Sequence, residues 1–409
     1  MSLNLPIIPP PADKRLAIHI NKSAQRALRQ GHPWLFADAI EHHSHDGDAG
    51  DLAVIFDHKR RFLAIGLYDP HSPIRVRLLH HGHPTPIDTD WWTNQLITTL
   101  HRRAPLLADP TTTAFRLIHG ENDGWPGLIL DKYDTTLVLK LYTHSWFPYL
   151  PLLIPLIQAQ HPFERLVLRL SRHLQDSQTF GLADGHILWG PPLTRPIPFL
   201  ENNLHFIADL IHGQKTGFFL DQRDNRARVE ALSQGKRVLN VFAYTGGFSL
   251  YAGRGGAQQV TSLDISAPAL DMAATIWNMN RDTLGHTLHE TIAADAFDQL
   301  EQWGRQQRQF DLIIVDPPSF ATRQNDLPQA RHAYQRLTRL VLPLLPPNAT
   351  LVSASCTARL PATDFFQLIL DTAAATGRHL TPFQRTHHPL DHPLGFPEGA
   401  YLKCLYATT

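Results

Sequence analysis

The sequence predicts an α/β protein built from a small N-terminal β-barrel, a central α+β domain and a C-terminal Rossmann-like domain. Its last part alternates apolar strands with helical segments, which is typical of a parallel sheet covered by helices on both faces. The first part instead contains short β-rich runs separated by turn residues. A proline-rich stretch at 190–198 is the best linker candidate. The expected domains are 1–79, 80–194 and 195–409.

Length and composition narrow the class of protein. A chain of 409 residues suggests two or three domains at about 150 residues per domain. No apolar stretch approaches the roughly 20 residues needed to cross a bilayer, and residues 1–13 lack the features of a signal peptide. Two cysteines are too few for a disulfide framework and show no metal-ligand spacing. We therefore expect a soluble cytoplasmic protein without a membrane partner or a metal.

The net charge of the chain does not indicate a nucleic-acid partner, because 37 basic and 37 acidic residues give a net charge of zero. Any RNA site must then be a local patch. The N-terminal barrel offers such a patch, with ordinary solvated charge as the alternative. Trp34 and Phe36 nearby are expected in the barrel core rather than in a base-stacking platform. The basic residues of the patch are Lys22, Arg26, Arg29, Lys59, Arg60 and Arg61.

Secondary-structure signals support the three domains. A helix is predicted over 23–30, with Gly31 at its C-terminal stop. The strands expected in the barrel are 16–20, 52–56, 62–66 and 74–79. The central domain should contain helices at 91–103 and 150–160, and strands near Arg116, Leu128 and Leu137 and at 166–170 and 187–189. The last domain should contain strands at 238–242, 259–263, 312–315 and 351–354, and a final strand around Cys404.

A glycine turn follows the first strand of the last domain. Gly246 and Gly247 let the backbone approach a ligand closely at the start of a helix. The dinucleotide spacing Gly-x-Gly-x-x-Gly is absent, which argues against a nicotinamide-dependent oxidoreductase. About 20 residues on, Asp264 ends the next strand and suits the two hydroxyls of a ribose. Asp295 is a candidate acceptor for an adenine amino group. For both aspartates the alternative is a helix N-cap.

Two further apolar runs end in reactive groups. Asp316-Pro317-Pro318 follows one strand, and the prolines stiffen the turn that holds the aspartate. Cys356 follows the next strand among small hydroxyl residues, where a thiolate would act as a nucleophile. The alternative for Cys356 is a buried small hydrophobe, and Cys404 is expected in the core. Both reactive ends should meet at the carboxyl edge of the sheet.

The chemistry of cytosine methylation explains why Asp316 and Cys356 would lie at one site. C5 of cytosine is a poor nucleophile, so an enzyme that methylates it adds a thiolate to C6 and thereby activates C5. Asp316 would stabilise the positive charge that develops at N3. The base that removes the C5 proton is not identified.

The chain resembles the large-subunit ribosomal RNA cytosine-C5 methyltransferase I family, whose last domain is a class I S-adenosylmethionine-dependent methyltransferase. Coverage is nearly end to end, and Tyr401-Leu-Lys403 ends the chain much as in family members. The resemblance rests on Gly31-His-Pro-Trp-Leu-Phe36, on Gln214-Lys-Thr-Gly-Phe-Phe-Leu-Asp-Gln-Arg223 with Asn225-Arg226, on Asn240-Val-Phe-Ala-Tyr-Thr-Gly-Gly-Phe248, and on Asp316-Pro-Pro with Ser355-Cys356.

The resemblance implies an N-terminal PUA domain, S-adenosylmethionine as cofactor, S-adenosylhomocysteine as product and large-subunit ribosomal RNA as substrate and partner. It also raises a homodimer as the oligomeric state to test. Cys356 would be the nucleophile, and Asp316 would be catalytic. The cofactor residues implied are Lys215, Thr216, Gln222, Arg223, Phe242, Tyr244, Gly246, Asp264, Asp295 and Asp316.

Two departures from the family pattern concern the catalytic motifs. Relatives often carry Lys after Asp-Pro-Pro and Ser after Cys, where this chain has Ser319 and Thr357. Ser319 lacks the cation that would favour a thiolate or a phosphate. Arg223 and Arg226 lie three residues apart, so on a helix they would share one face. That face could bind RNA phosphate or the cofactor carboxylate; the alternative is that both side chains are solvated.

Two other functions remain open. One is methylation of a nitrogen of guanine or adenine in RNA, which would not need Cys356. The other is a non-catalytic RNA-binding factor in ribosome assembly that retains a cofactor fold.

Overall fold

The structure is a computed structural model that describes residues 3–176, 179–321 and 323–409. Its backbone divides into two compact units. Unit 1 comprises Met1–Asn203, Ile207–Leu220 and Leu390–Phe396, and unit 2 comprises Leu204–Phe206, Asp221–Pro389 and Pro397–Thr409. The first two predicted domains thus fall together in unit 1, and the exact three-domain boundaries stay a prediction. No helix of the described residues is both long and apolar enough to span a membrane.

The N-terminal part of unit 1 is a six-stranded sheet in the order β2-β6-β5-β4-β1-β3. The predicted helix is confirmed as α1 (Lys22–Arg29); the side chain of Asn21 accepts a hydrogen bond from the amide of Ala24 at its start, and Gly31 follows its end with φ +85°. The strands are β1 (Leu16–Ile20), β2 (Trp34–Phe36), β3 (Ile40–His43), β4 (Leu52–Phe56), β5 (Phe62–Tyr68) and β6 (Ile74–His81), with a short 3-10 turn η1 (Ala37–Ala39).

The expected core position of Trp34 and Phe36 is wrong. Leu35 is the residue of β2 that enters the core, at 1% exposure, whereas Phe36 is 42% exposed and Trp34 is half-buried. Successive side chains of a strand point to opposite faces, so Leu35 and its two neighbours cannot share the interior. The indole nitrogen of Trp34 donates to Glu121 Oε1 at 2.8 Å.

The second sheet of unit 1 has five strands in the order β11-β10-β9-β8-β7. Helices α2 and α4 contribute Trp92, Leu96, Leu153 and Ile154 to its apolar core. The strands are β7 (Ala114–His119), β8 (Leu128–Tyr133), β9 (Thr136–Leu141), β10 (Arg165–Leu170) and β11 (Ile187–Trp189). The helices are α2 (Thr89–His101), α3 (Ala104–Leu107), α4 (Leu150–Gln160) and α5 (Arg172–Gln175), with 3-10 turns η2 (Gly120–Asp123) and η3 (His144–Tyr149).

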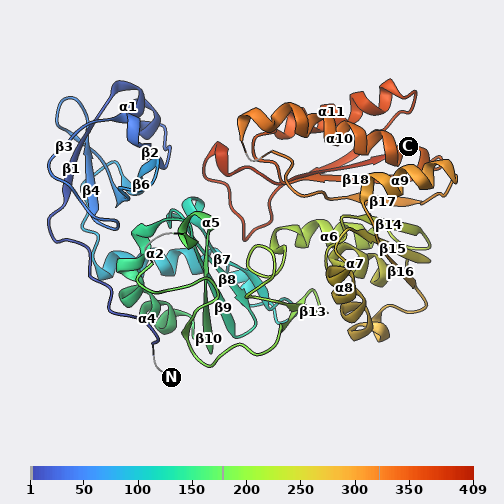
Figure 1. The fold of residues 1–409 in the computed structure, drawn as a ribbon, viewed down its shortest axis with the longest axis horizontal. Coiled ribbons are helices and arrows are strands. Elements are labelled where there is room, and N and C mark those ends of the chain that lie inside the picture. Colours follow the sequence, from blue (N-terminus) through green and yellow to red (C-terminus); the bar gives the residue numbers. More distant parts are fainter. Residues whose placement is uncertain (1–2, 177–178, 322) are drawn as a thin grey trace. The chain divides into compact units, whose positions relative to one another are not determined.

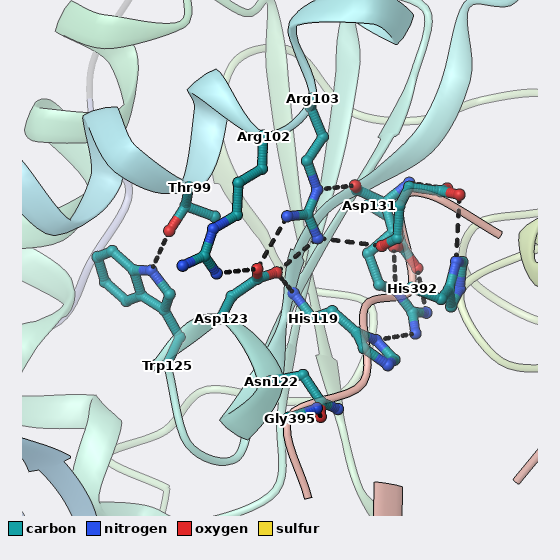
Figure 2. A network of polar contacts seen from close by, with 12 residues as sticks. Thr99, Arg102, Arg103, His119, Asn122, Asp123, Trp125, Asp131, His392 and Gly395 are labelled. Carbon is teal, nitrogen blue, oxygen red and sulfur yellow. Dashed lines mark hydrogen bonds and ion pairs between the residues drawn. The ribbon is translucent and has the colours of Figure 1, made fainter. Parts of the chain in front are cut away.

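A buried polar network ties a distant segment of the chain to this sheet (Figure 2). The guanidinium of Arg103 donates to both carboxylate oxygens of Asp123, and both side chains are fully buried. Segment 390–396 joins the network, because the carbonyl oxygen of Asp391 accepts from Arg103 Nη2 at 3.0 Å and its carboxylate accepts from the amide of Arg116 at 2.9 Å. Burying the charges of Arg103 and Asp123 is tolerated because the two groups pair with each other.

Two short strands, β12 (Ile197–Glu201) and β13 (Leu204–Ala208), follow the predicted linker. They form a two-stranded sheet.

Unit 2 is built on a seven-stranded sheet in the order β16-β15-β14-β17-β18-β20-β19 (Figure 1). Its strands are β14 (Arg237–Val241), β15 (Gln259–Asp264), β16 (Leu288–Ala293), β17 (Leu312–Val315), β18 (Thr350–Ser355), β19 (Thr381–Thr386) and β20 (Lys403–Thr408). The sequence predicts a parallel sheet, and this is corrected for one strand: β20 runs antiparallel to both β18 and β19. Periodicity cannot reveal strand direction, because buried strands of either direction read as apolar runs.

Helices cover both faces of this sheet. Figure 1 shows α10 and α11 on one side and α7 and α8 on the other. The helices are α6 (Arg223–Ala231), α7 (Gly247–Arg254), α8 (Ala267–Met279), α9 (Ala296–Arg305), α10 (Leu327–Val341) and α11 (Ala362–Ala375). Short 3-10 turns are η4 (Leu220–Gln222), η5 (Arg281–Thr283), η6 (Gln324–Asp326), η7 (Leu342–Leu344) and η8 (Pro397–Gly399). The doubly wound Rossmann-like fold is thus confirmed.

Strand order fixes the place of the site. Strands β15 and β17 flank β14 on opposite sides, so the order of connections reverses at β14. Open α/β sheets bind ligands at such a switch point, outside the carboxyl ends of the strands.

Candidate active site

The turn after β14 is built for a close backbone approach. Phe242, Tyr244 and Gly246 have φ values of 63°, 48° and 78°, a conformation that side chains other than glycine seldom adopt. A Cβ on Gly246 would lie 2.9 Å from Cβ of Ala273, so only glycine fits there. The turn leads into α7, whose first amide groups have no partners within the helix. Backbone of this shape is suited to holding a ligand against the sheet edge.

Asp264 at the end of β15 fastens this turn. One carboxylate oxygen accepts from the amide of Tyr244 at 2.8 Å, and the other accepts from the amide of Ser266 at 2.9 Å. The N-cap alternative for Asp264 is wrong, because Ser266 caps α8. Each carboxylate oxygen still has a second lone pair to accept from a ligand hydroxyl. The next residue, Ile265, is 74% exposed and offers an apolar surface at the same edge.

Asp295 lies past the end of β16, which pairs with β15 in parallel. Its Oδ1 accepts from the amides of Phe297 at 2.8 Å and Asp298 at 3.2 Å, so Asp295 is the N-cap of α9. The cap alternative is therefore confirmed. Contact with an adenine amino group stays a prediction, because a capping carboxylate keeps further acceptor capacity.

Asp316 is half-buried past the end of β17, where a chain of amide groups holds it. Gln222 Nε2 donates to Asp316 Oδ2 at 2.9 Å, and Asn225 Nδ2 donates to Gln222 Oε1 at 2.6 Å. The oxygen of the Asn225 side chain in turn accepts from the hydroxyls of Thr386 at 2.6 Å and Tyr406 at 3.0 Å. Strands β19 and β20 thereby help to orient Asp316.

Cys356 follows β18, and the structure brings it to the Asp316-Pro motif. Strands β17 and β18 are parallel neighbours, and Cys356 Sγ lies 4.0 Å from the carbonyl oxygen of Pro317. The hydroxyls of Ser319 and Thr357 are 3.4 Å apart, which joins the two loops a second time. Cys356 is half-buried, whereas Cys404 is fully buried in β20. The core prediction for Cys404 is confirmed.

Buried polar groups support the loop that carries Cys356. The hydroxyl of Tyr334 on α10 lies 2.8 Å from Ser355 Oγ and 2.9 Å from Thr357 Oγ1. Burial raises the pKa of Tyr334 to about 12, so the phenol stays protonated and able to donate. The ammonium of Lys403 on β20 donates to the carbonyl oxygens of Thr357 and of Tyr401. The residues on both sides of Cys356 are therefore held in place.

The remaining predicted cofactor residues are divided between the units. Lys215 and Thr216 belong to unit 1, where the hydroxyl of Thr216 donates to Asp131 Oδ2 at 2.6 Å. Their contact with a cofactor stays a prediction. Arg223 and Arg226 belong to unit 2 and are 4% and 2% exposed. The solvated alternative for these two arginines is wrong.

Sequence reasoning missed three contributors to the site. Nothing in the sequence marks Tyr334. Asn225 lies in a stretch that carries the family resemblance, but its role in the site is visible only after folding brings its partners near. Lys403 did leave a signal, since it is a cation followed by the apolar run Cys404-Leu-Tyr-Ala407. Across the described parts of the chain, no group of three His, Cys, Asp or Glu side chains could hold a metal ion.

Comparisons with known proteins agree with this geometry. A family model described as S-adenosylmethionine-dependent methyltransferase matches residues 154–406, and a PUA-like domain model matches residues 18–81. A ribosomal RNA large subunit methyltransferase of Deinococcus radiodurans is 44% identical over 96% of this chain and 97% of its own length. Ribosomal RNA large subunit methyltransferase I of Pseudoalteromonas translucida is 34% identical over 95% of this chain and 98% of its own length.

A solved structure confirms the fold. The crystal structure of a methyltransferase complexed with S-adenosylhomocysteine has a TM-score of 0.83 at 21% identity, and the match covers 97% of this chain and 100% of that chain. The two family models support the N-terminal PUA-like domain and S-adenosylmethionine as cofactor, both expected from the sequence. The chain belongs to the large-subunit ribosomal RNA methyltransferase family, as an S-adenosylmethionine-dependent methyltransferase with an N-terminal PUA-like domain.

Proposed function

We propose that the protein methylates C5 of a cytosine in large-subunit ribosomal RNA through a covalent bond between Cys356 and C6. The observation that carries the proposal is the meeting of Cys356 with the Asp316-Pro motif, where Sγ lies 4.0 Å from the carbonyl oxygen of Pro317. A nucleophilic thiol beside a stiff, carboxylate-bearing turn suits attack on a planar base. The names of the relatives support ribosomal RNA as the substrate.

The residues after β14 and β15 fit the cofactor. Asp264 would accept hydrogen bonds from its ribose, and the turn from Phe242 to Gly246 would lie against it. Exposed Ile265 would cover part of its adenine. When bound, S-adenosylmethionine supplies an electrophilic methyl group. Asp295 and Gln222 complete the proposed binding set in unit 2. Arg223, Lys215 and Thr216 stay proposed cofactor residues.

Cys356 carries the covalent chemistry. Its thiolate adds to C6, the C5–C6 double bond gives its electron pair to C5, and C5 takes the methyl group. A base then removes the C5 proton, the double bond re-forms and the carbon–sulfur bond breaks, which releases the thiolate. Each turnover thus returns Cys356 to its starting state.

Asp316 holds the base during these steps. Gln222 donates to one of its carboxylate oxygens at 2.9 Å, which fixes the plane of the carboxylate. The carboxylate would stabilise positive charge at N3 of the ring while the thiolate adds to C6. A group that is oriented before reaction contributes more than one that must reorganise during it.

The PUA-like domain would bind RNA outside the active site. Lys22, Arg26, Lys59 and Arg60 are exposed and would meet phosphates. Arg29 and Arg61 also pair with Asp57, at 3.0 Å and 2.8 Å. The proposed substrate places the protein in the cytoplasm. A homodimer stays a prediction, which sedimentation velocity on the full chain checks.

The test is transfer of radiolabelled methyl from S-adenosylmethionine to ribosomal RNA isolated from a strain that lacks the gene. After digestion to nucleosides, the label should be in 5-methylcytidine. Label in a nitrogen-methylated guanosine or adenosine would contradict the proposal and favour the nitrogen methyltransferase. Tight RNA binding without any label would favour a non-catalytic assembly factor.

A further inference from the structure

Lys403 is a cation buried beside the loop that carries Cys356. Lys403 is 1% exposed, and its ammonium donates to two backbone carbonyl oxygens, those of Thr357 and Tyr401. Lys403 forms no ion pair with a carboxylate of the described residues. Burying a charge costs several kcal/mol unless an opposite charge compensates it. Two hydrogen bonds to neutral groups therefore do not account for the burial of this ammonium.

The ionisable group beside Lys403 is Cys356. Strand register places the backbone of Lys403 opposite Ser355, and its ammonium donates to the carbonyl oxygen of Thr357, so Lys403 lies beside both residues that flank the thiol. Burial lowers the pKa of Lys403 to about 8, and the neighbouring Cys356 counteracts part of that fall. Near neutral pH the ammonium form therefore persists next to the thiol.

Other titratable groups around Lys403 and Cys356 do not replace this pairing. On α10 the phenol of Tyr334 stays protonated, and past β17 the carboxylate of Asp316 disfavours a second negative charge. Before β20, Nε2 of His388 accepts from the amides of Tyr401 and Leu402, so that nitrogen is occupied as an acceptor. Lys403 is thus a cation beside Cys356 that can compensate a negative sulfur.

From this geometry we infer that Lys403 is the positioning residue that holds Cys356 as a thiolate. The thiol proton leaves to solvent, the ammonium keeps its own three protons, and the sulfur and the ammonium form an ion pair. The same charge favours the sulfur as leaving group when the carbon–sulfur bond breaks. Lys403 thereby supplies the cation that Ser319 lacks, from a different strand. The inference rests on the proposed role of Cys356 as nucleophile.

The test measures thiolate formation without turnover. In a Cys404→Ala background, which leaves one thiol, the rate of alkylation by iodoacetamide is followed as a function of pH. Lys403→Met replaces the ammonium with an apolar chain of similar length. The midpoint of the alkylation profile should rise by about one pH unit, so alkylation near neutral pH slows about tenfold, with the same limiting rate at high pH.

The matched control is Lys236→Met. Lys236 is half-buried in the same unit, but it lies 3.4 Å from Thr350 Oγ1 at the opposite end of β18, so its removal should leave the alkylation profile unchanged. An unchanged profile in Lys403→Met would overturn the inference and leave Lys403 as a support for two carbonyl groups.

A reciprocal measurement keeps the inference testable if Lys403→Met does not fold. In Cys356→Ala the pKa of Lys403, followed by NMR of a labelled lysine side chain, should fall because the neighbouring sulfur is gone. No fall would also overturn the inference. Both measurements are independent of methyl transfer. If Lys403→Met shifts the alkylation profile but the natural enzyme forms no covalent adduct with RNA, the proposed function is contradicted and the role of Lys403 is not.

Discussion

The side-chain amide of Gln222 donates to a carboxylate oxygen of Asp316 at 2.9 Å, although 94 positions separate the two residues in the chain. Asn225 holds Gln222, and Thr386 and Tyr406 hold Asn225. The Asp316 carboxylate is thus oriented through three layers of hydrogen bonds that reach strands β19 and β20. Removing one member should disturb the chemistry more than the fold.

Gln222→Glu should reduce methyl transfer about 10²-fold near neutral pH. Near neutral pH two ionised carboxylates about 3 Å apart repel each other and have no proton to share, so the hydrogen bond and the orientation of Asp316 are lost. As the pH falls, the introduced carboxyl becomes protonated and donates as the amide did, so activity relative to the natural enzyme should recover. The pH profile of kcat measures this. The control, Gln258→Glu, changes an exposed residue and should match the natural enzyme; a uniform loss at every pH would refute the relay.

Asp264→Asn should weaken binding of S-adenosylhomocysteine at least about tenfold. The amide nitrogen it introduces would face the N–H of Tyr244 or of Ser266, and two donors cannot bond to each other. Titration calorimetry gives the affinity. Asp271→Asn, an exposed change on α8, should bind normally, and unimpaired binding in Asp264→Asn would show that this carboxylate does not hold the cofactor.

Asp123→Asn should lower the free energy of unfolding by about 3–5 kcal/mol. The substitution leaves the guanidinium of Arg103 fully buried without a counter-charge, and it also weakens the acceptor of the His119 amide. Urea unfolding followed by tryptophan fluorescence measures the loss, because Trp125 is close in the chain. The exposed change Asp46→Asn should be neutral. A loss below about 1 kcal/mol would mean that the network of Figure 2 is not a major source of stability.

Asp69 should make unit 1 acid-sensitive. Burial alone would raise its pKa, but the His144 ring, the Thr143 hydroxyl and the amide of His71 outweigh burial and lower the pKa to about 2. A lowered pKa stabilises the fold above the unfolded value of 3.8, and the contribution disappears as pH falls from about 4 to about 2. The natural protein should lose about 2 kcal/mol more than Asp69→Asn across that interval. Parallel losses in denaturant titrations of the two proteins would contradict this.

Long apolar runs made most of the fold predictable. Strands such as β17 and β18 are fully buried, so their sequences are continuous apolar or small stretches. Six strands were not predicted, and all of them are at the ends of their sheets: β2, β3, β12, β13, β16 and β19. Edge strands are paired on one side and partly exposed, so their sequences are short or polar. Leu288–Ala293 illustrates this, with three of its six residues exposed.

The site residues that directly follow a strand were predictable from the sequence. Cys356, Asp316 and Asp264 each end an apolar run, and parallel strands deliver such residues to one edge. The contacts that orient them were not predictable, because Gln222, Tyr334 and Lys403 come from other elements and depend on tertiary packing. Asp295 shows a limit of another kind: a capping aspartate and a ligand-binding aspartate have the same position at the start of a helix.

The most direct test of the proposed chemistry is trapping of the covalent intermediate. Fluorine at C5 of cytosine cannot be removed as a proton, so methylation stops with the carbon–sulfur bond intact. Incubation with 5-fluorocytosine-containing ribosomal RNA and S-adenosylmethionine should give an adduct that mass spectrometry maps to Cys356, with Cys404→Ala forming it normally. A Cys356→Ala enzyme that still methylates C5 of cytosine would contradict the account.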